Sequence, residues 1–358
     1  MRGERHTAAR TLSMRFSFSL PVLRDTTLRD PFGDTYRLAR IAEASGFDTA
    51  TIGHHHFMPG NLSDPLTFLA TVAARTDVLR VGTGIFQLPI HHPVRVAEQV
   101  ATIDQISGGR ISLGVGMGWW PLEYDVHGSV FAQRGARMEE ALQILRLVWT
   151  NEHATFHGRF HEFDDLTMHP RPVQRPHPPI WVAGVAPAAV DRAARLGDAW
   201  LWGPVQSLTT GRRCLDQYRS AAVTAGRPAD WILRRYAWLG TDKRRIVDEV
   251  LPAYVGGLVE HWRESAENAE ELALFARMDA GEAVTPQEIA TDRLLWGTPD
   301  DVIAQIQRYR ALTGCDHIHA AFGAGLPANA GDRSTLGEFA DVAEMLRLFG
   351  TEVIPAFG

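Results

Sequence analysis

The sequence predicts an α/β protein folded as a (β/α)₈ barrel, with one insertion between strands seven and eight. Eight short apolar runs of strand length alternate with amphipathic stretches of helical period. Most of these runs end in glycine, and no short repeat or low-complexity tract interrupts the rhythm. Strands that alternate with helices favour a parallel sheet, and eight such units close into a barrel. We expect the strands at Arg15–Leu20, Phe47–Ile52, Val81–Phe86, Ile111–Val115, Ile180–Ala183, Asp198–Trp202, Trp231–Leu239 and His317–Phe322.

Helices in the first half are predicted from their apolar stripes and their caps. A helix over Tyr36–Ser45 ends before Gly46, a residue that suits a C-terminal cap. Asp64 and Pro65 are typical of a helix start, with aspartate as N-cap and proline at the first position. The helix between strands three and four carries Val96, Ala97, Val100 and Ile103 at helical spacing and stops at Gly108-Gly109.

The second half follows the same rhythm until residue 242. Gln133–Thr150 has the strongest helical stripe, and a small hairpin is expected at His153–His161. Further helices are expected from Pro187 to Gly197, around Thr209–Ala225, after the capping pattern at Thr298, and from about Leu336 to Phe349. The segment Asp242–Trp296 is too long for an ordinary connection, so we expect an insertion that reaches the active face as a lid.

Composition limits the class of protein. The chain has 358 residues, 45% of them hydrophobic and 22% charged, as in soluble globular proteins. The net charge of -6 gives no general attraction to nucleic acid or to an anionic membrane. Only two cysteines occur, and no apolar run reaches the length of a membrane span. We expect a cytoplasmic protein with one domain over residues 14–358 and a loose arm at 1–13, upstream of a second possible start at Met14.

Two glycine-rich strand ends are candidate ligand sites. Gly184-Val185-Ala186-Pro187 places free backbone N–H groups at a helix N-terminus, which suits a phosphate, although a plain βα loop has the same pattern. Gly114-Val115-Gly116-Met117-Gly118 lacks the dinucleotide spacing, and Trp119-Trp120-Pro121 follows where that motif needs a helix. Glycine backbone beside two tryptophans could form a wall for a planar ligand, or the tryptophans could only pack the barrel rim.

The run His54-His55-His56, at the end of strand two, is the best candidate for acid–base chemistry. Metal binding is an alternative, since His54 and His56 would share a face if the strand continued, and ordinary packing histidines are another. Metal-dependent barrel hydrolases need further His and Asp ligands at later strand ends, and no acidic residue follows strand eight at Gly323. We therefore assign no metal. No Gly-x-Ser-x-Gly elbow is present, which disfavours a serine nucleophile.

Several motifs, in order, resemble those of luciferase-like flavin-dependent monooxygenases. Ile52-Gly53-His54-His55-His56-Phe57 resembles the Glu-His-His-Phe signature of bacterial luciferase, with His54 in place of the acidic residue. The resemblance continues to the C-terminus through Leu88-Pro89, His92-Pro93-Val94-Arg95, Asp104-Gln105 to Arg110, Gly114 to Tyr124, Phe156 to Phe160, Arg171 to Trp181 and Gly297-Thr298-Pro299.

This resemblance implies a barrel that binds flavin on the carboxyl-terminal face of its strands. The flavin ring is expected over a non-proline cis bulge at Gly84-Ile85 and beside Gly116, Met117, Gly118 and Trp119. The phosphate is expected at Gly184, Val185 and Ala186, where the family often has serine and this chain must rely on backbone donors. The catalytic histidine of the signature falls on His55.

The activity implied is a monooxygenase that takes reduced FMN and O₂ and oxygenates a small organic substrate. A separate NAD(P)H:flavin reductase would supply the flavin, because no second dinucleotide fingerprint occurs in the chain. A homodimer is implied as well. The alternatives are a deazaflavin-dependent oxidoreductase that transfers hydride, a non-enzymatic flavin-binding or light-emission accessory protein, and a metal-dependent barrel hydrolase.

Overall fold

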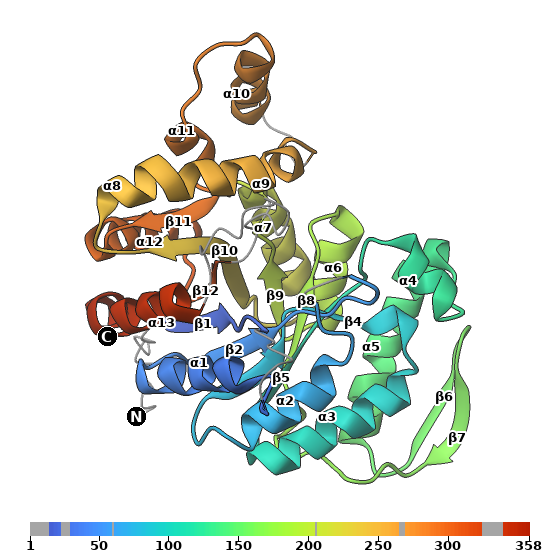
Figure 1. Ribbon diagram of the computed structural model, residues 1–358. Helices are drawn as coiled ribbons and strands as arrows, with labels where there is room; N and C mark the ends of the chain where they lie inside the picture. Colours follow the sequence, from blue (N-terminus) through green and yellow to red (C-terminus); the bar gives the residue numbers. More distant parts are fainter. Residues whose placement is uncertain (1–13, 23–28, 59–60, 205, 265–268, 324–338) are drawn as a thin grey trace, which may run out of the picture.

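The computed structural model describes residues 14–22, 29–58, 61–204, 206–264, 269–323 and 339–358, so the expected arm at 1–13 lies outside it. Eight parallel strands close into a barrel, as predicted (Figure 1). The barrel strands are β1 (Arg15–Ser19), β2 (Thr49–Ile52), β3 (Arg80–Thr83), β5 (Ile111–Gly116), β8 (Ile180–Ala183), β9 (Ala199–Trp202), β10 (Trp231–Leu239) and β12 (His317–Phe322). The barrel closes where β12 pairs with β1, with Phe16 opposite Ile318.

A ring of helices covers the outside of the barrel (Figure 1). They are α1 (Gly33–Ala44), α2 (Pro65–Ala73), α3 (Pro93–Ser107), α5 (Arg134–Thr150), α6 (Pro187–Leu196), α7 (Leu208–Thr224), α12 (Pro299–Thr313) and α13 (Phe339–Leu348). The predicted caps are present. The Asp64 carboxylate accepts from the N–H of Thr67, Gly108 takes the left-handed conformation with φ of 63°, and Thr298 forms a capping box with Asp301.

The expected insertion folds as helices followed by one strand. Its elements are α8 (Lys243–Arg245), η3 (Ile246–Val250), α9 (Leu251–Glu264), α10 (Ala269–Asp279), α11 (Pro286–Ala290) and β11 (Leu294–Gly297). In Figure 1, α10 and α11 stand on the outer side of α9. The strand β11 was not predicted; it pairs with the second half of β10 and extends the main sheet.

The insertion lies on the carboxyl-terminal side of the strands. The carboxylate of Glu271 on α10 accepts a short hydrogen bond from Thr210, in the first turn of α7, and a bond of 2.7 Å from Arg293. Since α7 follows the end of β9, this contact places α10 on the face where active sites of such barrels lie. The role of the insertion as a moving lid remains a prediction.

The remaining elements are short. The expected hairpin is formed by β6 (Ala154–His157) and β7 (Glu162–Leu166), which pair antiparallel. The others are β4 (Phe86–Gln87), η1 (Leu88–Ile90), α4 (Pro121–Val126), η2 (Phe131–Gln133), η4 (Phe349–Val353) and η5 (Ile354–Phe357). The short helix α4 corrects the sequence interpretation, which expected no helix after Trp119-Trp120; Pro121 occupies its first position.

None of the helices in the described parts of the chain combines the length and hydrophobicity that crossing a bilayer requires.

Candidate active site

The carboxyl-terminal ends of the barrel strands form an open, glycine-lined mouth. Gly53 follows β2 and Gly203 follows β9, and a Cβ added at either position would meet no atom of a described residue within 4 Å. Among the described residues, nothing fills the space beside these two strand ends. Since parallel strands end on the same rim, the glycines predicted at these positions lie around one mouth.

One side of the mouth is a floor built where β3 and β5 approach closely. The Gly84–Ile85 peptide is cis, as the resemblance implied. A Cβ at Gly84 would lie 2.6 Å from Oγ1 of Thr51, and one at Gly114 would lie 2.0 Å from the carbonyl oxygen of Thr83. The side chain of Ile85 fills the space beside Gly116, where a Cβ would come within 3.0 Å of it. Glycine is thus needed at these positions because a side chain would collide with its neighbours, and backbone without side chains allows a planar ring to approach closely.

An arginine reaches this floor from the barrel interior. Arg234 on β10 donates from Nη1 to the carbonyl oxygen of Gly84 and from Nη2 to Oγ of Ser19, both at 3.1 Å. No carboxylate among the described residues pairs with it, and its buried Nε has no partner there. Burial lowers the pKa of Arg234 from its ordinary value. Among the described residues, the floor is thus contacted by a cation that has no carboxylate partner.

His55 lies at the rim and contacts a buried carboxylate from another element. Nδ1 of His55 is 3.3 Å from Oε1 of Glu123, which is fully buried on α4. The same carboxylate accepts from the backbone N–H of His56 at 2.8 Å and from Nε2 of Gln87 at 2.9 Å. The sequence analysis found no acidic partner for His55, because His54 replaces the acidic residue of the signature; in space Glu123 supplies one.

The other histidines of the run form a buried cluster. His54 is 1% exposed, stacks on Phe86 and His91, and its Nε2 lies 2.8 Å from Nε2 of His56. Burial, reinforced by the neighbouring histidines, lowers the pKa of His54 to about 2 and that of His91 to about 4. Both rings are therefore neutral at physiological pH.

This cluster also bears on the metal alternative. Ring nitrogens of His54, His56 and His91 lie within 4.8 Å of one another. However, Nδ1 of His54 already accepts from the backbone N–H of Gln87 at 3.2 Å, and a neutral imidazole has only one lone-pair nitrogen. Nε2 of His54 must then carry the hydrogen and donate to His56. A metal would have to break the His54–Gln87 contact, so the donor set does not favour one.

The glycine-rich loop after β5 forms a side wall of the mouth. The Trp119 side chain is 60% exposed, and its ring centre lies 6.3 Å from that of His55. Met117 is held by a short hydrogen bond from the Tyr124 hydroxyl to its carbonyl oxygen. Gly118 has φ of 71°, and a Cβ there would lie 3.1 Å from Oε1 of Gln87. That buried oxygen has no donor among the described residues.

The predicted phosphate loop has the required donors. Gly184 has φ of 141° and its carbonyl oxygen accepts from Nε1 of Trp200, which fixes the turn into α6. The N–H groups of Val185 and Ala186 donate to no acceptor in the described part of the chain. Two free donors at the N-terminus of a helix of 10 residues suit an anion.

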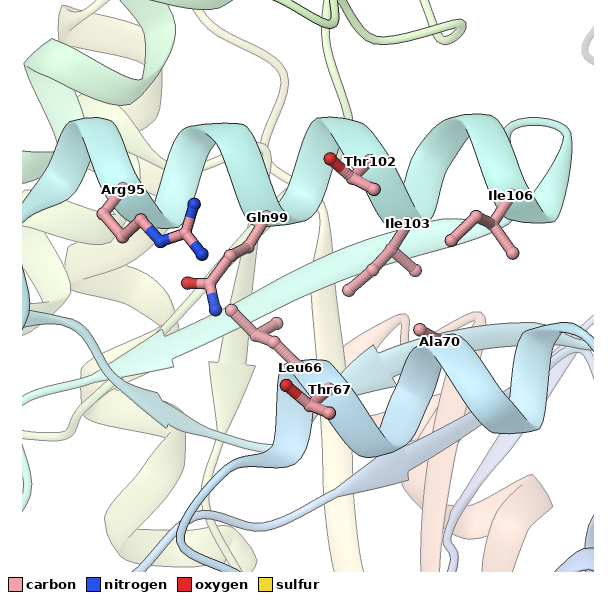
Figure 2. A pocket seen from close by; sticks show the side chains of 8 residues that line it. All are labelled: Leu66, Thr67, Ala70, Arg95, Gln99, Thr102, Ile103 and Ile106. Carbon is pink, nitrogen blue, oxygen red and sulfur yellow. The ribbon is translucent and has the colours of Figure 1, made fainter.

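The features described above fit a flavin: a floor of glycine backbone, a cation that contacts this floor, and free N–H groups for a phosphate. A separate groove lies on the outside of the barrel between α2 and α3 (Figure 2). It is not bordered by the strand ends, so we do not assign it as the active site.

Sequence reasoning missed Glu123, Gln87 and Arg234. Only Glu123 could have been suspected from the sequence, because it follows Pro121 in the first turn of a helix next to the glycine-rich loop. The other two lie among apolar strand residues and become recognisable only when the barrel closes.

Fold and site thus define a closed parallel barrel with a candidate cofactor site at its strand ends. The chain belongs to the luciferase-like monooxygenase family, whose sequence profile matches residues 14–316. It is 36% identical over 197 residues to an FMNH₂-dependent dimethylsulfone monooxygenase of Pseudomonas putida, an alignment that covers 53% of each chain. It is 31% identical over 190 residues to the oxygenase component of a flavin-dependent trigonelline monooxygenase of Acinetobacter baylyi, covering 51% of this chain and 52% of that one.

The aligned part spans about half the length of these curated relatives. The crystal structure of monooxygenase RslO1 from Streptomyces bottropensis is similar over almost the whole chain. It has a TM-score of 0.77 and 29% identity, and the match covers 96% of this chain and 100% of that one.

Proposed function

We propose that the protein is the oxygenase of a two-component monooxygenase, which takes reduced FMN and O₂ and oxygenates a small organic substrate. The observation that supports this most is the floor at Gly84 and Ile85, with the Arg234 cation beneath it and His55 at its rim. The floor suits a planar ring, and the family to which the chain belongs suggests that the ring is a flavin.

Bound reduced flavin would supply the electrons with which O₂ is activated for transfer of one oxygen atom to the substrate. The residues of this chain would then have distinct roles. Gly84, Ile85, Gly116, Met117, Gly118 and Trp119 would hold the ring, and Trp119 would help to exclude water. Gly184, Val185 and Ala186 would hold the phosphate through backbone N–H groups. His55 would give or take a proton at Nε2, as a general acid–base.

FMN is favoured over a deazaflavin coenzyme with a longer anionic tail. Such a tail would need cations leading away from Gly184. Arg171 and Arg175 precede β8 and so lie at its opposite end, where they donate to backbone carbonyls. Arg192 on α6 is buried, with its Nε 3.9 Å from a Glu139 carboxylate oxygen. These three arginines therefore do not form a cationic groove that leads away from the phosphate loop.

The source of electrons in this proposal is a separate NAD(P)H:flavin reductase. The chain has no dinucleotide fingerprint, and the relative from Acinetobacter baylyi is named as an oxygenase component. Cys214 and Cys315 are both buried and are not joined in a disulfide, which fits the reducing cytoplasm expected for such an enzyme.

A homodimer is part of the proposal, through the groove of Figure 2. The groove has a volume of about 260 Å³ and is lined by Leu66, Ala70, Ile103 and Ile106 with polar neighbours at its edges. Ile106 is 51% exposed beside the apolar lining of this groove, so a second chain seated there would bury it. Sedimentation velocity on the protein and on Ile106→Glu tests this, because a charge in the interface should give monomers.

The function is tested by anaerobic titration with photoreduced FMN and, in parallel, with a reduced deazaflavin coenzyme, followed by mixing with O₂. Tight binding of reduced FMN and its rapid oxidation by O₂ would support the proposal. Binding of the deazaflavin alone would contradict it and favour hydride transfer.

A further inference from the structure

The contacts around Glu123 define the state of His55 more closely than the family resemblance does. Nε2 of Gln87 lies 2.9 Å from Oε2 of Glu123, 3.2 Å from the carbonyl oxygen of His54 and 3.3 Å from Nδ1 of His55. An amide nitrogen has only two hydrogens. The two oxygen acceptors use both, so no hydrogen is left for Nδ1 of His55.

The orientation of the Gln87 amide is fixed by the same neighbours. Exchanging its oxygen and nitrogen would place the amide oxygen against the Glu123 carboxylate and the His54 carbonyl, which are both acceptors. That arrangement would be repulsive. The nitrogen therefore faces Glu123, and Nδ1 of His55 has one acceptor within reach, Oε1 of Glu123 at 3.3 Å.

We propose that Glu123 is a positioning residue, which accepts a hydrogen bond from Nδ1–H of His55 and thereby leaves the lone pair of Nε2 free for proton transfer at the mouth. This inference rests on the proposed function for its catalytic meaning. The neutral ring can carry only one hydrogen, so fixing it on Nδ1 determines which nitrogen can act.

The burial of Glu123 strengthens this inference. The side chain is fully buried, and no lysine or arginine in the described part of the chain pairs with it. When Nε2 of His55 takes up a proton, the positive charge of the ring lies next to a carboxylate that has no lysine or arginine partner among the described residues. A pair in this arrangement stabilises the charged histidine during proton transfer, as the aspartate does in a catalytic triad.

Glu123→Gln is the informative change because it keeps the shape of the side chain. The amide has one oxygen where the carboxylate has two. If that oxygen faces Gln87, the amide N–H₂ faces His55 and drives its hydrogen to Nε2, the wrong tautomer for a base. If the oxygen faces His55, it still accepts from the N–H of His56, but the two amide groups of residues 87 and 123 clash as donors, and a neutral amide oxygen is a weaker acceptor for Nδ1–H than a carboxylate. Either way, the contact that holds Nδ1–H of His55 is weakened.

The matched control is Glu140→Gln. Glu140 is also a buried glutamate that binds a histidine, with Oε1 2.7 Å from Nδ1 of His161, and it also accepts from the backbone N–H groups of Arg159 and Phe160. It connects α5 to the hairpin of β6 and β7, which lies outside the barrel wall in Figure 1. The substitution therefore repeats the chemical change away from the mouth.

The first measurement is nitrogen NMR of the ¹⁵N-histidine-labelled full chain without flavin, at about pH 8, where an ordinary histidine is neutral. The His55 signals are assigned by their loss in His55→Ala. We expect the wild type to carry its hydrogen on Nδ1, Glu123→Gln to shift it toward Nε2, and Glu140→Gln to leave it on Nδ1. A wild-type His55 with the hydrogen on Nε2 would overturn the inference, even if Glu123→Gln failed to fold.

The second measurement is a double-mutant cycle on the rate at which O₂ oxidises reduced FMN bound to the protein. We expect Glu123→Gln to slow this reaction by roughly 10²-fold in the wild type and not at all in His55→Ala, because the glutamate acts only through the histidine. Equal losses in both backgrounds would overturn the inference. If the wild type showed the predicted tautomer but no reaction with reduced FMN, the Glu123 assignment would be supported and the monooxygenase proposal contradicted.

Discussion

The guanidinium of Arg234 donates a hydrogen bond of 3.1 Å to the carbonyl oxygen of Gly84, 150 positions away in the sequence. The bond crosses the barrel from β10 to the end of β3, and its acceptor belongs to the peptide that forms the proposed flavin floor. The floor thus receives both its support and a positive charge from the opposite wall.

We expect Arg234→Met to weaken binding of reduced FMN more than binding of oxidised FMN. Reduced flavin is the more negatively charged form at neutral pH, so the loss of a nearby cation should change the ratio of the two affinities by roughly tenfold, or about 1.4 kcal/mol. Anaerobic titrations with both forms measure that ratio.

Arg235→Met is the control, since it removes the same charge from the next residue on the strand. Arg235 points to the other side, where its guanidinium lies over the Trp202 ring at 5.2 Å. The control should lose stability and keep the affinity ratio. Equal shifts in both variants would show that the charge under the floor has no special role.

Removal of one backbone donor tests the phosphate loop. Ala186 has φ of -64° and ψ of 145°, angles that proline tolerates, and its N–H donates to no described residue. We expect Ala186→Pro to bind FMN roughly 10- to 100-fold more weakly, because a hydrogen bond to a charged group contributes about 1.5–3 kcal/mol. Riboflavin has no phosphate, so its affinity should not change. An equal loss for both ligands would indicate general damage to the loop.

We expect His55→Ala to slow turnover by roughly 10²–10⁴-fold, the usual contribution of a general acid–base, with flavin affinity nearly unchanged. Steady-state kinetics and a flavin titration of the same preparation separate the two effects. His92→Ala is the matched control, because His92 precedes α3 and contacts His161 rather than the mouth. Wild-type turnover in His55→Ala would move the assignment to His54 or His56.

Much of the fold could be predicted from the sequence, because barrel strands are buried on both faces and therefore appear as continuous apolar runs. β8, β10 and β12 have the bounds that were predicted, and β1, β5 and β9 differ by one residue. The strand β11 was missed because it adds to the edge of β10 after a long helical segment, where no local pattern distinguishes it.

The site was less predictable from the sequence than the fold. His55 and the strand-end glycines belong to local motifs, so they could be named in advance. The partners of His55 are different, because Glu123 comes from α4 and Gln87 from β4, and their contact depends on how these two short elements pack. Arg234 lies in an apolar strand, and its role could not be predicted until its hydrogen-bond partner across the barrel, the carbonyl oxygen of Gly84, was known.

Buried neutral histidines should make the fold sensitive to mild acid. Burial, with a smaller effect of Arg15, lowers the pKa of His317 to about 3 from the ordinary 6.5. Between these values the unfolded chain binds a proton that the folded protein does not, so the free energy of unfolding falls as pH falls below 6.5. The effect is at most about 1.4 kcal/mol per pH unit for each such histidine.

Urea unfolding at several pH values between roughly 7 and 4 measures this slope. We expect His317→Asn to reduce the slope of the free energy of unfolding against pH by the contribution of one histidine. The rest of the slope should remain, because the pKa values of His54, His91 and His319 are also lowered. Identical slopes in the variant and the wild type would contradict the assignment of a neutral buried ring.

The central claim is that the protein receives its flavin already reduced. The most direct measurement compares two reactions of the purified wild type: stopped-flow oxidation by O₂ of photoreduced FMN bound to the protein, and consumption of NADH or NADPH by the protein with oxidised FMN. We predict rapid, protein-dependent oxidation in the first and no consumption of nicotinamide above the background in the second, until a flavin reductase is added. Efficient consumption of NADPH without a reductase would contradict the two-component account.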